Sequence, residues 1–178
     1  MRIAAAIVLA VVGGCAATST PYMPLEVGET WTYRLTTGKG AADFSMSITG
    51  KDGKGYVMME PGGRVVHWRI EEGYLVLDRE REVIPFFDVP PRIGLSWSLT
   101  GEDGRTYFVK VRGYEDVTVP AGKFPKCLRV EMEDEGREKL AIFHFAKAVG
   151  LVRREEIGKS GRVLIELEKA NLVVSKKQ

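Results

Sequence analysis

The sequence predicts an all-β protein in which an antiparallel, curved sheet closes as a barrel, a half-barrel or a two-sheet sandwich, with little helix. Three observations lead to this class. Apolar and polar residues alternate with a period of two along most of the chain from Leu25 onward. Turn-forming residues separate the alternating runs, and no run has the three-and-four spacing of a helical face. The runs predict about ten or eleven strands.

Each predicted strand has apolar side chains on one face and polar side chains on the other, which is typical of strands buried on one side. The apolar positions, in chain order, are Trp31, Tyr33 and Leu35; Phe44, Met46 and Ile48; Val66, Trp68 and Ile70; Tyr107, Val109 and Val111; Leu128, Val130 and Met132; and Val163, Ile165 and Leu167. A sheet with one apolar face must bury it, and a barrel or a sandwich does so.

Turn signals between the runs predict short hairpins and therefore antiparallel pairing. They are Asp52-Gly53, Pro61-Gly62-Gly63, Glu72-Gly73, Asp103-Gly104, Pro120-Ala121-Gly122 and Gly158–Gly161. A transmembrane barrel would show the same alternation, but its strands need about 9–11 residues and most of these runs are shorter.

The N-terminus has the layout of a bacterial export signal. Arg2 precedes an apolar run, Ile3–Val12, that is shorter than the roughly 20 residues of a membrane-spanning helix. The run ends in Val12-Gly13-Gly14-Cys15, which resembles the lipobox recognised by the bacterial lipoprotein signal peptidase. We therefore expect residues 1–14 to be a signal peptide cut between Gly14 and Cys15, with the lipid attached to Cys15.

The resulting domain prediction is a lipidated tether over residues 15–22 and a single β domain over residues 23–178. Cleavage after Ala17 is the alternative, and it would release a soluble periplasmic protein. The anchored form would face the periplasm. Ala16 stands where inner-membrane retention uses an aspartate, so the outer membrane is favoured over the inner one.

Two segments repeat one pattern. Pro24–Trp31 and Pro90–Trp97 each place Gly four residues after Pro and Trp three residues after Gly. A second internal similarity, at a different offset, relates Thr49–Lys54 to Thr100–Arg105. The two different offsets indicate either short local motifs that recur or an internal repeat shifted by insertions.

The chain also resembles a family of uncharacterised bacterial lipoproteins with shared motifs. Pro-Leu-x-x-Gly-x-x-Trp-x-Tyr is matched by Pro24, Leu25, Gly28, Trp31 and Tyr33. Val-x-Val-Pro-Ala-Gly-x-Phe-x-x-Cys is matched by Val117, Val119, Pro120, Ala121, Gly122, Phe124 and Cys127. A closing aromatic strand with Val-Gly-Leu-Val is matched by Phe143, Phe145 and Val149–Val152, with Lys147-Ala148 in place of the usual Pro-Gly. The resemblance implies the same β-rich fold over most of the chain and brings no activity.

Composition limits the possible functions. The chain has 178 residues, 44% hydrophobic and 28% charged, which is typical of a globular protein. A net charge of +2 argues against a nucleic-acid-binding protein, which needs a strongly basic surface. With Cys15 lipidated, the other of the two cysteines, Cys127, would lack a disulfide partner.

No residue pattern predicts an enzyme, a metal site or a cofactor. A Cys127 nucleophile would need a base, and the two histidines, His67 and His144, lie far from it in sequence. Two histidines without paired cysteines make a poor zinc site, and the Asp-Gly turns lack the further oxygen ligands of a calcium loop. A hydrolase that uses Cys127 or paired carboxylates remains the alternative.

Carboxylates are plentiful, and a glycosidase would need two of them facing each other in a cleft. They occur as Glu71-Glu72, Asp78-Glu80-Glu82, Glu131-Glu133-Asp134-Glu135 and Glu155-Glu156. They alternate with arginines that we expect on outward faces, namely Arg79, Arg81, Arg129, Arg153 and Arg154. The pattern therefore predicts a solvated, ion-paired surface.

The aromatic residues offer the remaining functional candidates. Trp31, Tyr33, Trp68 and Trp97 could line a cavity for an apolar ligand, although a place in the core is favoured. We therefore expect a membrane-anchored, non-enzymatic binding or assembly module. Its partner would be a lipid-like ligand or another envelope protein.

Overall fold

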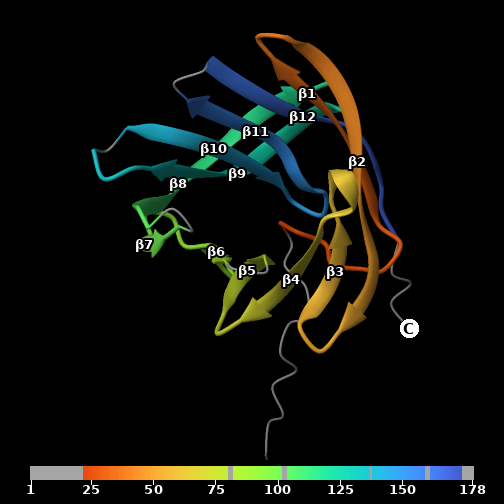
Figure 1. The fold of residues 1–178 in the computed structure, drawn as a ribbon, viewed down its shortest axis with the longest axis horizontal. Helices are drawn as coiled ribbons and strands as arrows, with labels where there is room; N and C mark the ends of the chain where they lie inside the picture. The colour runs from red at the N-terminus through yellow and green to blue at the C-terminus, as the bar shows by residue number, and fades with distance from the viewer. Residues whose placement is uncertain (1–21, 80–81, 102–103, 137, 159–160, 174–178) are drawn as a thin grey trace, which may run out of the picture.

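The computed structural model describes residues 22–79, 82–101, 104–136, 138–158 and 161–173. Within these ranges, 12 antiparallel strands form one sheet, and the helical structure is a single 3-10 turn, η1 (Pro61–Gly63). The strands surround a common interior as a nearly closed barrel (Figure 1). The all-β prediction is confirmed. The strands are more numerous than the predicted number of about ten or eleven, because five-residue strands such as Gly55–Met59 show little alternation.

The strands differ widely in length, and the longest has 14 residues. They are β1 (Thr30–Thr37), β2 (Gly40–Asp52), β3 (Gly55–Met59), β4 (Val65–Glu71), β5 (Tyr74–Arg79), β6 (Glu82–Asp88), β7 (Ser96–Thr100), β8 (Thr106–Val119), β9 (Gly122–Glu133), β10 (Lys139–Ala146), β11 (Gly150–Gly158) and β12 (Gly161–Asn171).

Strands that are neighbours in sequence are also neighbours in the sheet, except at one seam. The order is β6-β5-β4-β3-β2-β1-β12-β11-β10-β9-β8-β7, so β6 and β7 are the two edges of the described sheet. The Trp97 indole N–H bridges these edges by donating to the Pro85 carbonyl at 3.0 Å. Its ring also packs edge-on against Tyr74, with 6.4 Å between centroids. Side-chain contacts of this kind join the two edges of the barrel.

The repeated Pro–Gly–Trp pattern has the same structure in both halves of the barrel. The amide of Gly28 donates to the Ile48 carbonyl at 2.8 Å, and the amide of Gly94 donates to the Val111 carbonyl at 2.9 Å. The Ile48 and Val111 amides each donate back, at 2.9 Å, to the residue that follows the glycine. Each pattern thus docks the first strand of one arm, β1–β6 or β7–β12, on the second strand of that arm. The second similarity falls at non-equivalent places in the two arms, between β2 and β3 and between β7 and β8.

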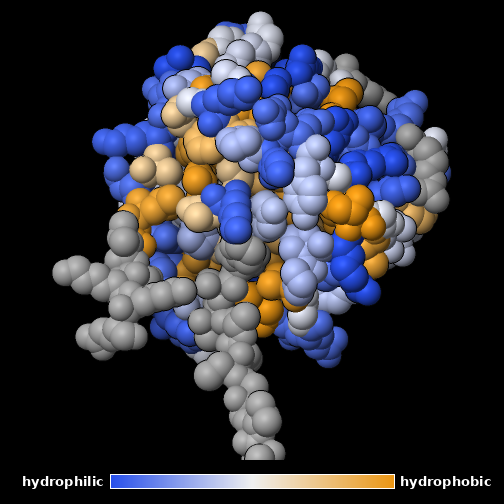
Figure 2. Space-filling model, turned by 180° about the vertical axis from the view of Figure 1, so that it is seen from behind, coloured by the Kyte–Doolittle hydropathy of each residue, from blue (hydrophilic) through white to orange (hydrophobic). Residues whose placement is uncertain are grey.

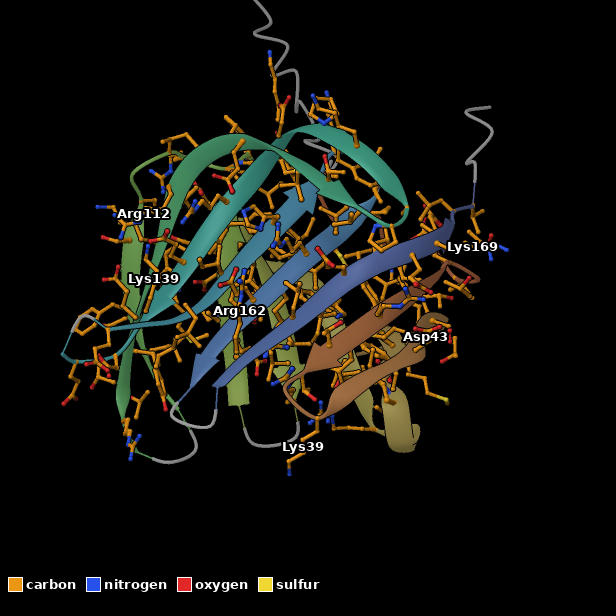
Figure 3. The ribbon with its side chains drawn as sticks, turned by 90° about the horizontal axis from the view of Figure 1, so that it is seen from above. Lys39, Asp43, Arg112, Lys139, Arg162 and Lys169 are labelled. Carbon is orange, nitrogen blue, oxygen red and sulfur yellow. The ribbon has the colours of Figure 1, made fainter. Side chains whose placement is uncertain are left out.

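The up-and-down order places alternate turns at opposite ends of the barrel. The tether end holds residues 22–29, the β6–β7 link and the β8–β9 turn, and the far end holds the β1–β2 and β3–β4 turns and the end of β5. Figure 3 shows Lys39, in the β1–β2 turn, and Lys169, near the end of β12, toward opposite ends of the strands. At the tether end, the Ala121 amide donates to the Leu167 carbonyl at 2.9 Å. The β8–β9 hairpin therefore reaches the β12 side of this end, where Met23 and Leu25 are buried.

The apolar faces predicted from the alternation meet in one core. Trp31, Val66, Val130 and Leu167 are among its buried members. Rings from β6 and β10 meet across the interior, with 5.1 Å between the centroids of Phe87 and Phe145. These contacts hold the two arms together on the side of the seam.

Candidate functional site

The interior of the barrel holds a cavity of about 360 Å³. It extends from Met23, near the tether end, to Leu35, Ala42 and Pro61 at the far end. Ala42 and Pro61 are exposed to solvent, whereas Met23 at the opposite limit is buried, so the far end is the mouth. The volume falls in the range of small-molecule binding sites.

The walls of the cavity are largely apolar, and aromatic rings form a substantial part of them. Tyr33 and Phe44 stack with 5.5 Å between ring centroids, and Trp68 packs against Phe86 at 5.3 Å. Six rings line the space: Tyr33, Phe44, Trp68, Phe86, Phe143 and Phe145. Such a surface favours an apolar ligand, because burying rings of this size against hydrocarbon removes much apolar area from water.

One charged residue, Arg154, enters the cavity because β11 contains a β-bulge. The pairing of β11 with β10 shifts between Leu151 and Arg153, so that Val152 is an extra residue. An extra residue reverses the facing of the strand beyond it. Leu151 and Arg154 therefore both line the cavity, and the Arg154 guanidinium lies 5.4 Å from the centroid of the Phe143 ring.

A second arginine, Arg79, reaches the cavity from β5. It continues the inward alternation of Leu75 and Leu77, which are buried. Its Nη2 lies 3.7 Å from a carboxylate oxygen of Glu60. Glu60 also accepts a hydrogen bond of 2.7 Å from Nε of Arg64, which lies at the rim.

These charges form a compact group at the mouth. Arg154 is also in an ion pair with Glu156. Burial lowers the pKa of the Arg154 guanidinium; Glu156 raises that pKa and Arg79 lowers it. We define the mouth cluster as Glu60, Arg64, Arg79, Arg154 and Glu156. The cavity lining also includes Asp43, which is in an ion pair with Arg34 at 3.3 Å. The three arginines and two glutamates of the mouth cluster therefore leave positive charge beside an apolar space.

The four aromatic residues predicted to bind ligand lie in different places. Tyr33 and Trp68 line the cavity. Trp31 packs near the tether end, where its indole N–H donates to the Val149 carbonyl, and Trp97 lies at the seam. The structure thus brings together two of the four, Tyr33 and Trp68, in the cavity.

The expectation that Arg79 and Arg154 face outward is wrong. For Arg79, the alternation with Leu75 and Leu77 was a signal in the sequence that could have placed it inside. For Arg154 no such signal exists, because simple alternation from Leu151 places Arg153 inside and a bulge cannot be read from the residues.

Cys127 lies in an environment that suppresses its reactivity. It is fully buried, and its thiol donates to the Phe124 carbonyl at 3.4 Å. Burial, together with the nearby carboxylates of Asp116 and Glu115, raises the pKa of this thiol to about 11. The thiol is therefore protonated at neutral pH, which is the opposite of an activated nucleophile.

The two histidines contact carboxylates. His67 Nε2 lies 3.0 Å from Asp52, and His144 Nε2 lies 2.5 Å from Glu115. His144 is buried beneath side chains on the outer surface of β8, β9 and β11, and burial lowers its pKa, although Glu115 opposes this shift. Among the described residues, no group of His, Cys, Asp and Glu is arranged to hold a metal ion.

Carboxylates of the outer surface are mostly ion-paired, as the charge pattern predicted. Glu131 is held by Arg112 at 2.6 Å and by Arg129 and Lys139. Although burial alone would raise the pKa of Glu131, hydrogen bonds from these cations lower it. Figure 2 shows a face on which hydrophilic residues predominate around smaller hydrophobic patches.

The predicted cleavage and lipid-attachment residues, Gly14 and Cys15, lie outside the described part of the chain. Tyr22, the last residue of the predicted tether, is described and stacks on Tyr114 with 6.2 Å between centroids. No helix in the described ranges is long and apolar enough to span a membrane.

Comparison with known proteins bears on the fold. No protein-family model matches the sequence, and no curated protein matches it. Among solved structures, a candidate exported protein of Bacteroides fragilis with a YmcC-like fold aligns with a TM-score of 0.55 at 16% identity, over 86% of this chain and 100% of that one. The two proteins share a fold.

Two further structures align more loosely. A candidate lipoprotein of Parabacteroides distasonis has a TM-score of 0.46 and 17% identity, over 85% of this chain and 99% of that one. The hypothetical lipoprotein YmcC of Escherichia coli has a TM-score of 0.41 and 8% identity, over 83% of this chain and 87% of that one. The similarity to the YmcC-like fold concerns architecture, and the ligand must be argued from the cavity.

Proposed function

We propose that the protein is an envelope lipoprotein, anchored through Cys15, that binds the apolar part of a lipid-like ligand inside its barrel. The observation that carries this proposal is the aromatic cavity of about 360 Å³ with its mouth at the far end. Protein interiors are close-packed, with few voids larger than a water molecule. An apolar hollow of this size that opens to solvent is the usual form of a ligand site.

The anchor and the location rest on the N-terminal sequence. Val12-Gly13-Gly14-Cys15 has the lipobox pattern, and structures with similar or more loosely similar folds are described as exported or as lipoproteins. The protein would face the periplasm, with the outer membrane favoured. Of the binding and assembly roles expected from the sequence, the cavity supports binding.

The proposal includes no catalytic step. The Cys127 thiol is buried and protonated, and the Glu131 carboxylate is held by three cations. A hydrolase would need an accessible nucleophile or two carboxylates facing each other across a cleft.

A pair of substitutions on β2 tests whether the cavity holds a ligand. Ala42 lies at the mouth, and its neighbour Ala41 faces the other side of the strand. We expect Ala42→Trp to fill the mouth and Ala41→Trp to leave it open. The measurement is mass spectrometry of small molecules that copurify with each protein from native membranes.

We expect the wild type and Ala41→Trp to carry an apolar molecule in near-stoichiometric amount. In Ala42→Trp its amount should fall at least about tenfold, because the added ring occupies the space of the ligand. A wild-type protein without bound molecules, or equal loading of the two variants, would contradict the proposal.

A further inference from the structure

The chemistry of the mouth cluster bears on which lipid-like molecule the cavity takes, and this argument rests on the proposed function. Arg79 and Arg154 line the same apolar space as Trp68 and Phe86. They also line a smaller hollow of about 60 Å³ that adjoins it. A charged group beside apolar walls is costly unless a partner of opposite charge approaches it. Here the nearby carboxylates are too few for the arginines.

Three side chains of the cavity lining have a buried polar atom without a hydrogen-bond partner. Among the described residues, Nε of Arg79, Nε of Arg154 and Nε1 of Trp68 are buried and have no hydrogen-bond partner. Each of these atoms can only donate a hydrogen bond. These three donors therefore lack acceptors, and a ligand that supplies acceptor oxygens would satisfy groups that the protein leaves unsatisfied.

The positions of these groups define an orientation. Arg79 is the last residue of β5 and lies toward the mouth, whereas Met23 lies at the opposite limit of the cavity. The aromatic side chains line the space between. A molecule with a polar head and an apolar chain would place its head at the mouth cluster and its chain toward Met23.

We infer that the ligand is a single-chain anionic amphiphile, whose carboxylate or phosphate head is bound by Arg79 and Arg154. Planar guanidinium groups bind such oxyanions with charge-assisted hydrogen bonds. At about 30 Å³ per water-sized group, the volume of about 360 Å³ fits a chain of about a dozen carbon atoms. A cationic amphiphile of the same length is disfavoured by the two arginines.

Isothermal titration calorimetry with ligands of matched chain length tests this inference. Dodecanoate, 1-dodecanol and dodecyltrimethylammonium share the chain and differ in head charge, and acetate has the head without the chain. All titrations use the Cys15→Ala chain, which has no acyl group of its own that could enter the cavity. We expect dodecanoate to bind at least about tenfold more tightly than 1-dodecanol, and acetate and the cationic ligand to show no binding.

Neighbouring arginines on β11 provide matched variants. Arg154→Met removes the charge from the cavity, and Arg153→Met removes one that is near Glu166, at 3.7 Å. Arg154→Met should lower the affinity for dodecanoate at least about tenfold and change that for 1-dodecanol less than about twofold. Arg153→Met should change neither. A thermal unfolding midpoint for Arg154→Met at or above that of the wild type would show that the loss is not due to misfolding.

The outcomes separate this inference from the proposed function. Equal binding of dodecanoate and 1-dodecanol, or unchanged dodecanoate binding by Arg154→Met, would overturn the anionic head while leaving an apolar ligand in place. Acetate binding as tightly as dodecanoate would overturn it in favour of a small-anion site. If no ligand with an alkyl chain binds, both the anionic head and the proposed function are contradicted.

Discussion

The indole N–H of Trp31 donates to the main-chain carbonyl of Val149 at 2.7 Å, although the two residues are far apart in sequence. Trp31 is fully buried. This bond joins the Gly-x-x-Trp segment at the start of β1 to the Val-Gly segment at the start of β11, so two motifs that are separate in sequence form one structural unit.

Replacing Trp31 with Phe should lower the free energy of unfolding by about 1–3 kcal/mol, because the Val149 carbonyl loses its donor in a buried place. Urea denaturation measures this change. Trp97→Phe is the matched control, since Trp97 loses a similar bond to Pro85 but is only partly buried. Its effect should be smaller, about 1 kcal/mol or less. Equal decreases in the free energy of unfolding of the two variants would contradict a larger contribution from the hydrogen bond to Val149.

Gly150 packs beside Trp31, which leads to a second prediction. Its φ is +100°, and a Cβ there would lie 3.2 Å from Met23 Sδ and 3.6 Å from Trp31 Nε1. Gly150→Ala should therefore destabilise the protein by roughly 1–3 kcal/mol. Gly161→Ala has similar backbone strain, at φ +114°, but has no atom within 4 Å of the added Cβ. The two variants share the backbone strain, so a lower denaturation midpoint for Gly150→Ala would report the contact of its Cβ with Met23 and Trp31. Identical midpoints would contradict a destabilising contact there.

Stability should fall as the pH is lowered through the titration of His144. Burial lowers its folded-state pKa below the ordinary value of 6.5, against the opposing effect of Glu115; the charges of Arg129 and Arg153 also lower it. Because the unfolded state then binds the proton more readily, this contribution is fully present above pH 6.5 and is lost as the pH falls through the folded pKa.

Urea midpoints at pH 8 and pH 5 measure the effect of His144. His144→Gln should flatten the dependence between these pH values, and His67→Gln, which changes the other histidine, should leave it intact. A dependence that is unchanged in His144→Gln would assign the titration to another group.

The Cys127 thiol should react only when the protein unfolds. With its pKa raised to about 11 by burial, little thiolate exists at pH 7. In the Cys15→Ala chain, a thiol reagent should modify the native protein at least about a hundredfold more slowly than the protein in urea. Fast modification of the native protein would restore Cys127 as a candidate nucleophile.

The alternation of residues was sufficient to predict most of the strands and the apolar core. Trp31, Tyr33 and Trp68 lie on inward faces, since the period of two directly reports which side chains share a face. Closure as a barrel was one of three shapes that the pattern allowed. It depends on the pairing of β1 with β12, which makes one sheet of the two arms, and on contacts across the seam such as that of Trp97 with Pro85. Both join distant segments that share no local signal.

The candidate site was less accessible to prediction. Tyr33 and Trp68 were found because large aromatic residues on an inward face must pack or line a space. Arg154 was missed because the Val152 bulge depends on the pairing with β10. Arg79 was missed because a charged residue at a strand end is usually solvated, and here the strand end is the mouth of a cavity.

The chain enters the barrel at one end, and the mouth opens at the other. An anchor at Cys15 would therefore direct the mouth away from the bilayer in which that anchor is embedded. Molecules from that bilayer could not slide into the barrel directly and would first have to cross water or travel on a carrier. Such a protein would exchange its ligand with something on the opposite side of the aqueous compartment.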